Sequence, residues 1–311
     1  MKTSTVFLSI VVGVNGFVPL VPSFSGRVVA PSSSTATQHP LSMGLNPELA
    51  ANFPRDFSNI PKGTDYGEGK DAALNKVFEE TRIDFLEHQL MESLKAVAEV
   101  KKNPVFTTAL IAGDCVILDA IAKAGLLDKI RVVFIDTFFL FPESIDFLHE
   151  IEDHYGFKAK VYHCEDCATQ QEFYDKYGED YWMEDIDDYD KKCKVEPLMR
   201  ALKEGDTEAW INGRRRDHGF ERAALPLWEG QKFNPLAFWS FEDCWTYLRT
   251  HNVPYHPLHD VGFSSLGDMQ STRKVVPLEK WFSYGGERSG RFEGMKNKDG
   301  SEKTECGIHS K

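Results

Sequence analysis

The sequence predicts an α/β fold, a parallel sheet with helices on both faces, and two observations support this. Short apolar, often β-branched runs alternate along the chain with segments whose apolar residues recur at helical spacing. The apolar runs also end in polar or glycine-containing turns, such as Ala112-Gly113-Asp114 and Asp136-Thr137. Strands that alternate with helices pair in parallel and are covered on both faces, so the polar turns mark one functional edge of the sheet.

The first expected element is a helical segment over residues 72–101, either one long helix or a broken pair, because its apolar residues recur at spacings of three and four. An apolar run over 105–112 follows and changes to helical spacing after Gly113-Asp114, which predicts a strand, a turn and a helix. Residues 131–136 form a β-branched run and predict the second strand. Residues 142–155 predict a helix, since proline is accepted in a first helical turn.

The remaining elements complete the set of strand ends. Residues 158–163 predict a third strand, and a helix that begins at Cys193 or Pro197 and ends at residue 203 leads into a fourth strand over 209–213. In parallel sheets, ligands bind beyond the carboxyl ends of the strands, where turn amides and helix N-termini can hold phosphate. We therefore expect the ligand site at the turns that follow these four strands.

Composition excludes several classes of protein. The chain has 311 residues, 36 Lys plus Arg and 48 Asp plus Glu, for a net charge of -12, and is long enough for one large or two smaller domains. This acidic balance argues against nucleic acid or anionic lipid as a general partner, since both are bound by basic surfaces. Six cysteines are too few for a disulfide scaffold, so each thiol is interpreted singly.

The N-terminal segment has the composition of a targeting sequence. Residues 1–47 contain no Asp or Glu, and an apolar run over 6–14 is too short to span a bilayer. We expect a signal peptide over 1–16 and a transit-peptide-like segment over 17–47, which together resemble the two-part presequence of plastids bounded by extra membranes. The expected location is the plastid stroma, with the secretory pathway as the alternative.

Two groups of residues suggest anion chemistry. Arg214, Arg215 and Arg216 follow the fourth strand, with Arg222 close behind, and guanidinium groups match phosphate or sulfate oxygens in pairs. The alternative is a solvated loop whose arginines pair with surrounding acids. Near the end of the chain, Cys306 stands alone beside a glycine, and nearby Lys and His side chains favour the nucleophilic thiolate. Its alternative is an incidental exposed thiol.

These residues lead to a family resemblance. Glu305-Cys306-Gly307-Ile308-His309 resembles the E-C-G-L/I-H terminus of the assimilatory sulfonucleotide reductases, which reduce phosphoadenylyl sulfate (PAPS) or adenylyl sulfate (APS). Further segments match that family in the same order, over about residues 75 to 311. They are Asp136-Thr137 with Phe141-Pro142-Glu143, Lys194-Val195-Glu196-Pro197, Gly213 to Arg216 through Arg222 and Leu225-Pro226, Tyr255 to Leu258, and Gly267-Asp268 through Ser271-Thr272-Arg273.

The resemblance implies a fold and an activity. The fold is that of the adenine-nucleotide α-hydrolase-like (Rossmann-like) proteins, with an N-terminal helical region over 48–104, a sulfonucleotide-binding reductase domain over 105–280 and a flexible catalytic tail over 281–311. The activity is reduction of PAPS or APS to sulfite in sulfate assimilation, towards cysteine biosynthesis. Cys306 attacks the substrate sulfur and forms an S-sulfo intermediate, which an external thioredoxin or glutaredoxin then releases. The resemblance leaves open whether the protein is a monomer or a homodimer.

The resemblance also implies site residues. Cys306 is the nucleophile, and His309 holds the tail over bound substrate. Substrate binding is assigned to Gly113, Asp114, Asp136, Thr137, Lys194, Glu196, Gly213, Arg214, Arg215, Arg222 and Arg273.

Cysteine positions indicate the cluster-free type of reductase, with no metal. Iron-sulfur members of the family carry an adjacent Cys pair before the K-V-x-P segment and a C-x-x-C at the position of Gly267 to Ser271, whereas this chain has only Cys193. Most cluster-free members use PAPS and some plastid-type members use APS, so both substrates stay open. Cys164 and Cys167 form an additional C-x-x-C, a redox switch or half a metal site, for which a structural or regulatory role is favoured because two acids separate the thiols.

Two other classes of protein are weighed against the reductase. An ATP-pyrophosphatase on the same fold is disfavoured because its glycine- and serine-rich phosphate loop is missing. A non-catalytic adenine-nucleotide-binding regulatory protein draws on the altered loop at residues 112–114, but retention of Cys306 argues against it.

Overall fold

The structure, a computed structural model, describes residues 55–64, 69–272 and 275–309, which belong to one compact unit of the chain. The predicted signal peptide over 1–16, the transit segment over 17–47 and Arg273 lie outside the described residues. No helix within the described ranges combines the length and the apolar character needed to cross a bilayer.

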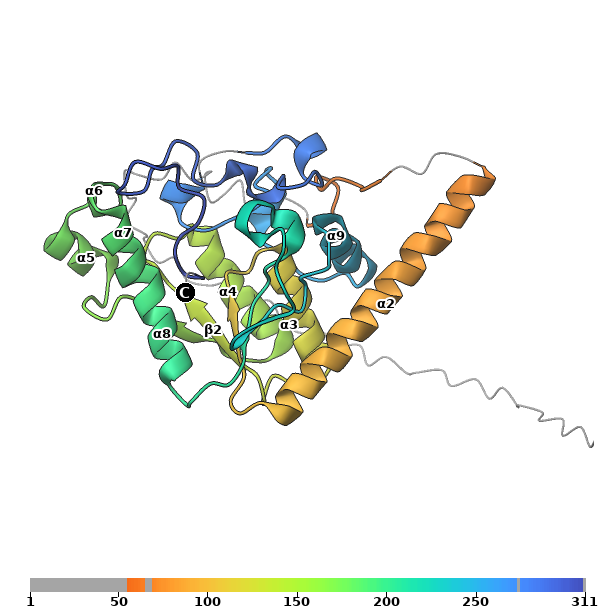
Figure 1. The fold of residues 1–311 in the computed structure, drawn as a ribbon, viewed down its shortest axis with the longest axis horizontal. Coiled ribbons are helices and arrows are strands. Elements are labelled where there is room, and N and C mark those ends of the chain that lie inside the picture. Colours follow the sequence, from red (N-terminus) through yellow and green to blue (C-terminus); the bar gives the residue numbers. More distant parts are fainter. Residues whose placement is uncertain (1–54, 65–68, 273–274, 310–311) are drawn as a thin grey trace, which may run out of the picture. The chain divides into compact units, whose positions relative to one another are not determined.

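The centre of the fold is a sheet, which Figure 1 labels at β2. Its strand order is β3-β2-β1-β4-β6-β5. The strands are β1 (Val105–Thr108), β2 (Arg131–Ile135), β3 (Lys160–Tyr162), β4 (Trp210–Ile211), β5 (Trp228–Glu229) and β6 (Lys232–Phe233). Each neighbouring pair from β3 to β6 is parallel, as predicted, whereas the edge strand β5 pairs antiparallel with β6. The hairpin of β5 and β6 was not predicted, because two residues in each strand are too few to show alternation.

Helices occupy most of the chain between the strands. The α-helices are α2 (Lys70–Val100), α3 (Ala112–Lys123), α4 (Pro142–Tyr155), α5 (Gln170–Tyr177), α6 (Tyr181–Glu184), α7 (Ile186–Asp190), α8 (Glu196–Lys203) and α9 (Phe241–Thr250). A π-helical turn, η1 (Lys191–Val195), joins α7 to α8. The 3-10 turns are η2 (Arg216–His218), η3 (Phe220–Arg222), η4 (Pro257–His259), η5 (Met269–Ser271), η6 (Leu278–Lys280) and η7 (Glu287–Gly290).

Helix predictions from the sequence agree closely with the structure. The segment expected over 72–101 is the single helix α2, and α4 has the predicted bounds, with Pro142 in its first turn and Gly156 in the left-handed conformation that ends it. The first strand was predicted too long, since β1 ends at Thr108 instead of residue 112. Beyond Thr108, the amide of Ala109 donates to the Asp114 carboxylate at 2.7 Å, and that of Leu110 donates to the Thr108 hydroxyl at 2.9 Å. Side chains thus take the hydrogen bonds that a longer strand would need.

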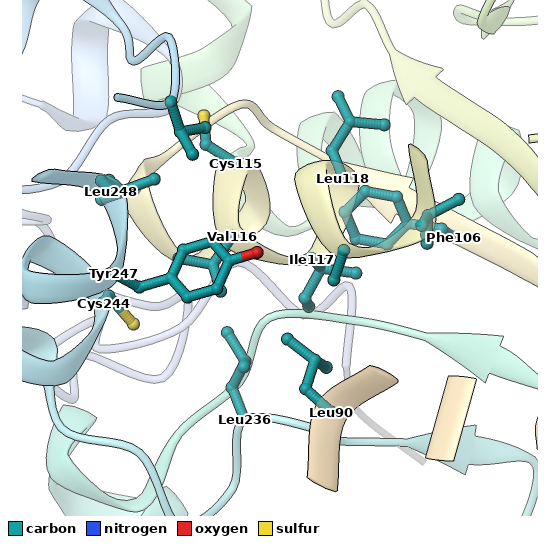
Figure 2. Close-up of a cluster of buried hydrophobic side chains, with 14 of the residues drawn as sticks. Leu90, Phe106, Cys115, Val116, Ile117, Leu118, Leu236, Cys244, Tyr247 and Leu248 are labelled. Atoms are coloured by element: carbon teal, nitrogen blue, oxygen red, sulfur yellow. The ribbon is translucent and has the colours of Figure 1, made fainter. Parts of the chain in front are cut away.

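Alternate residues of the strands face two separate cores, which confirms helices on both faces. Val105 and Val133 point to the face covered by α8, where they pack with Leu198 and Leu202. Phe106, like its neighbours Val132 and Phe134 on β2, faces the larger core that contains α3, α9 and the C-terminal half of α2. Figure 2 shows this core, where Leu90, Phe106, Leu236 and Tyr247 surround Val116 and Ile117.

The strand order creates a crevice at one edge of the sheet. After β1, the chain adds β2 and β3 on one side and then returns to place β4 on the other side of β1. Connections that leave neighbouring strands in opposite directions open a crevice beyond their carboxyl ends, where ligands bind in this class of sheet. The functional site is therefore expected beyond the ends of β1 and β4.

Candidate active site

A pocket with about 190 Å³ of free volume lies at this crevice. Its wall combines strand ends, cationic side chains and the C-terminal tail. The strand ends and following turns supply Thr107, Thr108, Ala109, Ile111, Asp114, Ile135, Thr137, Trp210, Asn212 and Gly213. The cations are Lys194, Arg214, Arg222, Arg288 and Arg291, and the tail supplies Cys306, Ile308 and His309. Predicted residues from five distant parts of the chain thus meet in one place.

Cys306 is the thiol that reaches this pocket. It is half-buried, whereas the other five cysteines of the chain are buried outside the pocket wall. Lys194, Arg288 and Arg291 each interact electrostatically with Cys306. The Cys306 thiol therefore shares the pocket with three cations, which suit an anionic ligand.

The tail that carries Cys306 is docked over the pocket. Before the cysteine, the buried Lys303 pairs with Asp190 at 2.7 Å. After it, Ile308 packs against the core under α8, and the carbonyl of His309 accepts a hydrogen bond from Lys232 at 2.7 Å. Burial and the nearby Arg222 keep the pKa of His309 well below its ordinary value, so the ring is neutral. The segment expected to be flexible therefore has anchors on both sides of Cys306.

Lys194 enters the pocket from the π-helical turn η1. Its ammonium pairs with Asp190 at 2.5 Å and with Asp268 at 2.6 Å. Burial alone would lower the pKa of Lys194, but Asp268 and Asp190 outweigh it and the net shift is upward. Thr137 donates to the second oxygen of Asp268 at 2.6 Å and fixes that carboxylate. Lys194 is thus a permanently charged group in the pocket wall, and Thr137 positions its partner.

Arg214 and Arg222 lie in the pocket wall, as predicted from the arginine-rich turn after β4. The Arg214 guanidinium donates to Asn212 at 3.0 Å and pairs with Glu229 at 3.0 Å. Arg222 contacts His218 Nδ1 at 3.0 Å and pairs with Glu305 of the tail at 2.7 Å. Both guanidinium groups are therefore held in fixed orientations at the crevice.

Arg215, also predicted to bind substrate, lies behind the wall. Its side chain is fully buried and pairs with Glu287 and with Asp217. His218 faces the same Glu287 at 2.9 Å, and burial lowers the pKa of His218 to about 3 despite that carboxylate. Burial would raise the pKa of Glu287, but Arg215 and His218 hold it far below its ordinary value. Arg215 therefore neutralises a buried acid, and its side chain is not part of the pocket wall.

Close packing explains the two glycines near the first strand. A side chain on Gly213 would collide with the Asp114 carboxylate, and one on Gly113 would lie 3.0 Å from the Arg215 guanidinium. Asp114 lines the pocket, while Gly113 does not. Burial raises the pKa of Asp114 to about 7, partly offset by the amide hydrogen bond from Ala109. Its charge therefore changes near neutral pH, at the edge of an anion site.

Two further predicted residues stay outside the wall. Asp136 accepts a hydrogen bond from the amide of Phe138 at 2.8 Å and shapes the turn after β2. Glu196 pairs with Arg200 at 2.9 Å on the surface of α8. Arg273 lies outside the described residues.

Sequence reasoning missed several residues of the wall. Arg288 and Arg291 belong to the segment that starts at η7, and Trp210 is the first residue of β4. Gly267 lies so close to Arg291 that any side chain there would collide with the guanidinium group. Two arginines three positions apart, upstream of the Cys306 motif, were the available signal, but only the fold places them in the same pocket wall as Lys194.

The thiols do not fit an iron-sulfur cluster. Cys193 follows Lys192 instead of a second cysteine, and it is buried with Cys164 and Cys167 in an apolar cluster that contains Phe173. Burial raises the pKa of Cys193 and of Cys167, which favours neutral thiols over the thiolates that bind metals. Over the described part of the chain, His, Cys, Asp and Glu form no group of three or more that could hold a metal ion.

Known proteins resemble this chain in sequence and in fold. A sequence model described as the phosphoadenosine phosphosulfate reductase domain matches residues 103–274. A Schizosaccharomyces pombe protein named "Probable phosphoadenosine phosphosulfate reductase" is 39% identical over 209 residues, which are 66% of this chain and 73% of that protein. The phosphoadenosine phosphosulfate reductase of Saccharomyces cerevisiae is 37% identical over 217 residues, 65% of this chain and 77% of that protein.

A solved structure of a reductase has a similar fold. The crystal structure of phosphoadenylyl-sulfate (PAPS) reductase from Candida auris, in a phosphate complex, aligns with a TM-score of 0.53 and 32% identity, covering 61% of this chain and 95% of that one. The family match covers more than half of the chain, including all four predicted parallel strands and the Lys194 segment. The chain therefore belongs to the phosphoadenosine phosphosulfate reductase domain family.

Proposed function

We propose that the protein is an oxidoreductase that reduces a sulfonucleotide, PAPS or APS, to sulfite with electrons from thioredoxin or glutaredoxin. The observation that carries this proposal is the position of Cys306 in a pocket lined by Lys194, Arg222, Arg288 and Arg291, at the carboxyl ends of β1 and β4. A nucleophilic thiol and a set of cations suit a substrate that is both electrophilic at sulfur and anionic. Membership of the reductase family supports the same activity.

The first step is a transfer of the sulfo group to Cys306. The Cys306 thiolate attacks the substrate sulfur, a bond forms between the two sulfur atoms, and the bond from sulfur to the phosphate oxygen breaks. The electron pair of that bond leaves with the nucleotide, as adenosine 3′,5′-bisphosphate from PAPS or as AMP from APS. Arginine and lysine groups of the wall stabilise the charge that develops on the leaving phosphate.

The second step needs an external dithiol. One thiolate of the reductant attacks the Cys306 sulfur, sulfite departs with the electron pair of the sulfur-sulfur bond, and a mixed disulfide remains. The second thiol of the reductant then displaces Cys306, which returns to its reduced form. One dithiol is oxidised for each sulfite released, and no metal or cluster takes part in this scheme.

PAPS is the favoured substrate, and APS reduction without a cluster is the alternative. The relatives named above carry PAPS in their descriptions. The 3′-phosphate that distinguishes PAPS from APS requires an additional cationic contact, for which Arg273 is a candidate from the sequence alone.

The test is sulfite release by the protein without residues 1–47, supplied with thioredoxin and a thiol reductant, with PAPS and APS in parallel. A visible spectrum of the enzyme accompanies the assay. Turnover of PAPS without cluster absorbance would support the favoured activity, and turnover of APS without absorbance would support the alternative. Absence of turnover on both, with intact nucleotide binding, would favour the non-catalytic binding protein.

We also propose that the protein works in the plastid stroma. The acid-free composition of residues 1–47 supports this proposal. A fluorescent protein fused after residue 47 should enter plastids of an alga with multiply bounded plastids, whereas release into the medium would favour the secretory alternative.

A further inference from the structure

Four cations of the pocket, Lys194, Arg214, Arg222 and Arg288, have acidic partners, which are of two kinds. Lys194 pairs with Asp190 and Asp268, and Arg214 pairs with Glu229, so acids on the body of the protein balance these charges. Arg222 and Arg288 instead share an acid of the tail. That acid is next to the nucleophile in sequence, so its ion pairs link the arginines directly to the Cys306 segment.

The shared acid is Glu305. A single oxygen, Oε2, lies 2.7 Å from the Arg222 guanidinium and 3.2 Å from that of Arg288. Arg288 also donates to the carbonyl of Thr304 at 2.9 Å. One anionic oxygen held between two guanidinium groups is the arrangement that binds a phosphate or sulfate oxygen.

The two arginines need an anion between them. They come from different elements, η3 and η7, and both side chains are largely buried, with 10% and 14% of their surface exposed. Burial and the like charge of Arg222 lower the pKa of Arg288 to about 10, while Glu305 acts in the opposite direction. Without Glu305, this pair of like charges would have to attract another anion or move apart.

We propose that Glu305 occupies the anion subsite of Arg222 and Arg288 in the ligand-free protein, and that a sulfate or phosphate group displaces this carboxylate and frees the Cys306 segment. This inference rests on the proposed function, because it assigns the subsite to the anionic group of a sulfonucleotide. The exchange replaces one anion with another at the same two arginines, so it leaves no unpaired charge in the wall.

The anchors of the tail confine the movement. Lys303 is held by Asp190 before Glu305, and His309 stacks on Trp210 after it. Release of Glu305 therefore loosens residues 304–308 while both ends of the tail stay attached. With the tail docked, Cys306, Ile308 and His309 form part of the pocket wall, so loosening of this segment changes the space open to a ligand.

The test compares Glu305→Gln with the wild type in the proposed mature chain. Calorimetry measures the Kd of inorganic sulfate, of inorganic phosphate and of AMP. We expect the neutral amide to compete less well, so the Kd for sulfate should fall about three- to tenfold in Glu305→Gln. Glu305→Asp keeps the charge and should bind sulfate nearly as the wild type does. Glu302→Gln, at an exposed position of the same tail, is the matched control and should show no change.

Alkylation of Cys306 by iodoacetamide gives a second readout, since the other cysteines are buried. Inorganic sulfate should accelerate alkylation of the wild type, and Glu305→Gln should react faster even without sulfate. Unchanged or weaker sulfate binding by Glu305→Gln would overturn the inference. An alkylation rate that responds neither to added sulfate nor to the Glu305→Gln substitution would overturn it as well.

These measurements are independent of turnover. If sulfite release fails with both sulfonucleotides while the shifts in sulfate affinity and alkylation occur, the proposed function is wrong and the anion subsite stands. If sulfite is released but the shifts are absent, only the role of Glu305 is wrong.

Discussion

The imidazole of His309 stacks on the indole of Trp210, with ring centroids 5.1 Å apart and an angle of 14° between the planes. Trp210 belongs to β4, at the crevice of the sheet, and its indole donates to Thr107 at 2.7 Å on β1. The contact therefore attaches the end of the tail to the two strands that form the site. Because the ring of His309 is neutral, stacking brings no charge into the pocket.

Removal of this stack should loosen the tail without changing the sheet. In His309→Ala, we expect about a tenfold lower kcat with a smaller change in KM, because the nucleophile would be positioned less well while the arginines stay in place. Steady-state sulfite release and the rate of Cys306 alkylation measure both effects. A retained aromatic ring in His309→Phe should preserve much of the activity, and equal loss in both variants would argue for a chemical role of the imidazole.

Replacement of the nucleophile separates binding from chemistry. Cys306→Ser should abolish sulfite release and the S-sulfo adduct, because a hydroxyl is a far poorer nucleophile than a thiolate. Nucleotide binding should remain within about threefold of the wild type, since the serine is similar in size. Intact-protein mass spectrometry after incubation with substrate, without reductant, detects the adduct. Turnover by Cys306→Ser at the wild-type rate would exclude the mechanism.

Arg215 and Arg222 follow the same strand but should respond differently to substitution. Arg215→Met leaves Glu287 buried without its guanidinium partner and should lower the free energy of unfolding by about 3 to 5 kcal/mol. Arg222→Met should lower stability by less than Arg215→Met, because Glu305 keeps Arg288 as a partner, and should lower kcat/KM by about 100-fold. Urea unfolding and sulfite release measure the contrast. Similar stability losses in the two variants would contradict the assignment of Arg215 to the interior.

Anion affinity should depend on pH through Asp114. Its pKa is raised to about 7, so the carboxyl is largely neutral below this pH and negatively charged above it. A negative charge in the wall repels an anion, so the Kd for AMP should rise as pH increases from about 6 to about 8, by roughly three- to tenfold. Asp114→Asn lacks this titration and should give a flatter profile. Parallel profiles for the two proteins would exclude Asp114 as the source.

The contact between Gly213 and Asp114 predicts a coupled pair. Gly213→Ala should destabilise the protein by about 1 to 3 kcal/mol, because the new methyl group meets the carboxylate. In Gly213→Ala combined with Asp114→Ala, that clash is absent, and part of the loss should be recovered. Additive losses in a double-mutant cycle of unfolding free energies would show that the two residues do not interact.

Local patterns in the sequence determined the main elements and the chemical groups. Helical spacing was enough for α2 and α4, and the apolar runs located four parallel strands, because these features depend on neighbours in the chain. The tail motif around Cys306 and the arginines after β4 carried the family resemblance. Strand lengths and the β5 and β6 hairpin escaped prediction, because they depend on hydrogen bonds to distant residues.

Only the tertiary structure decided which charges face a ligand. Arg214 and Arg215 are neighbours with the same side chain, yet one lines the pocket and the other neutralises Glu287 in the interior. The sequence could not separate them, because their partners lie on β5 and η7, and the fold brings those segments together. The same holds for Glu305, whose bond to two arginines arises only when the tail closes on the crevice. Residue type determined what each group can do, and long-range packing determined where it does so.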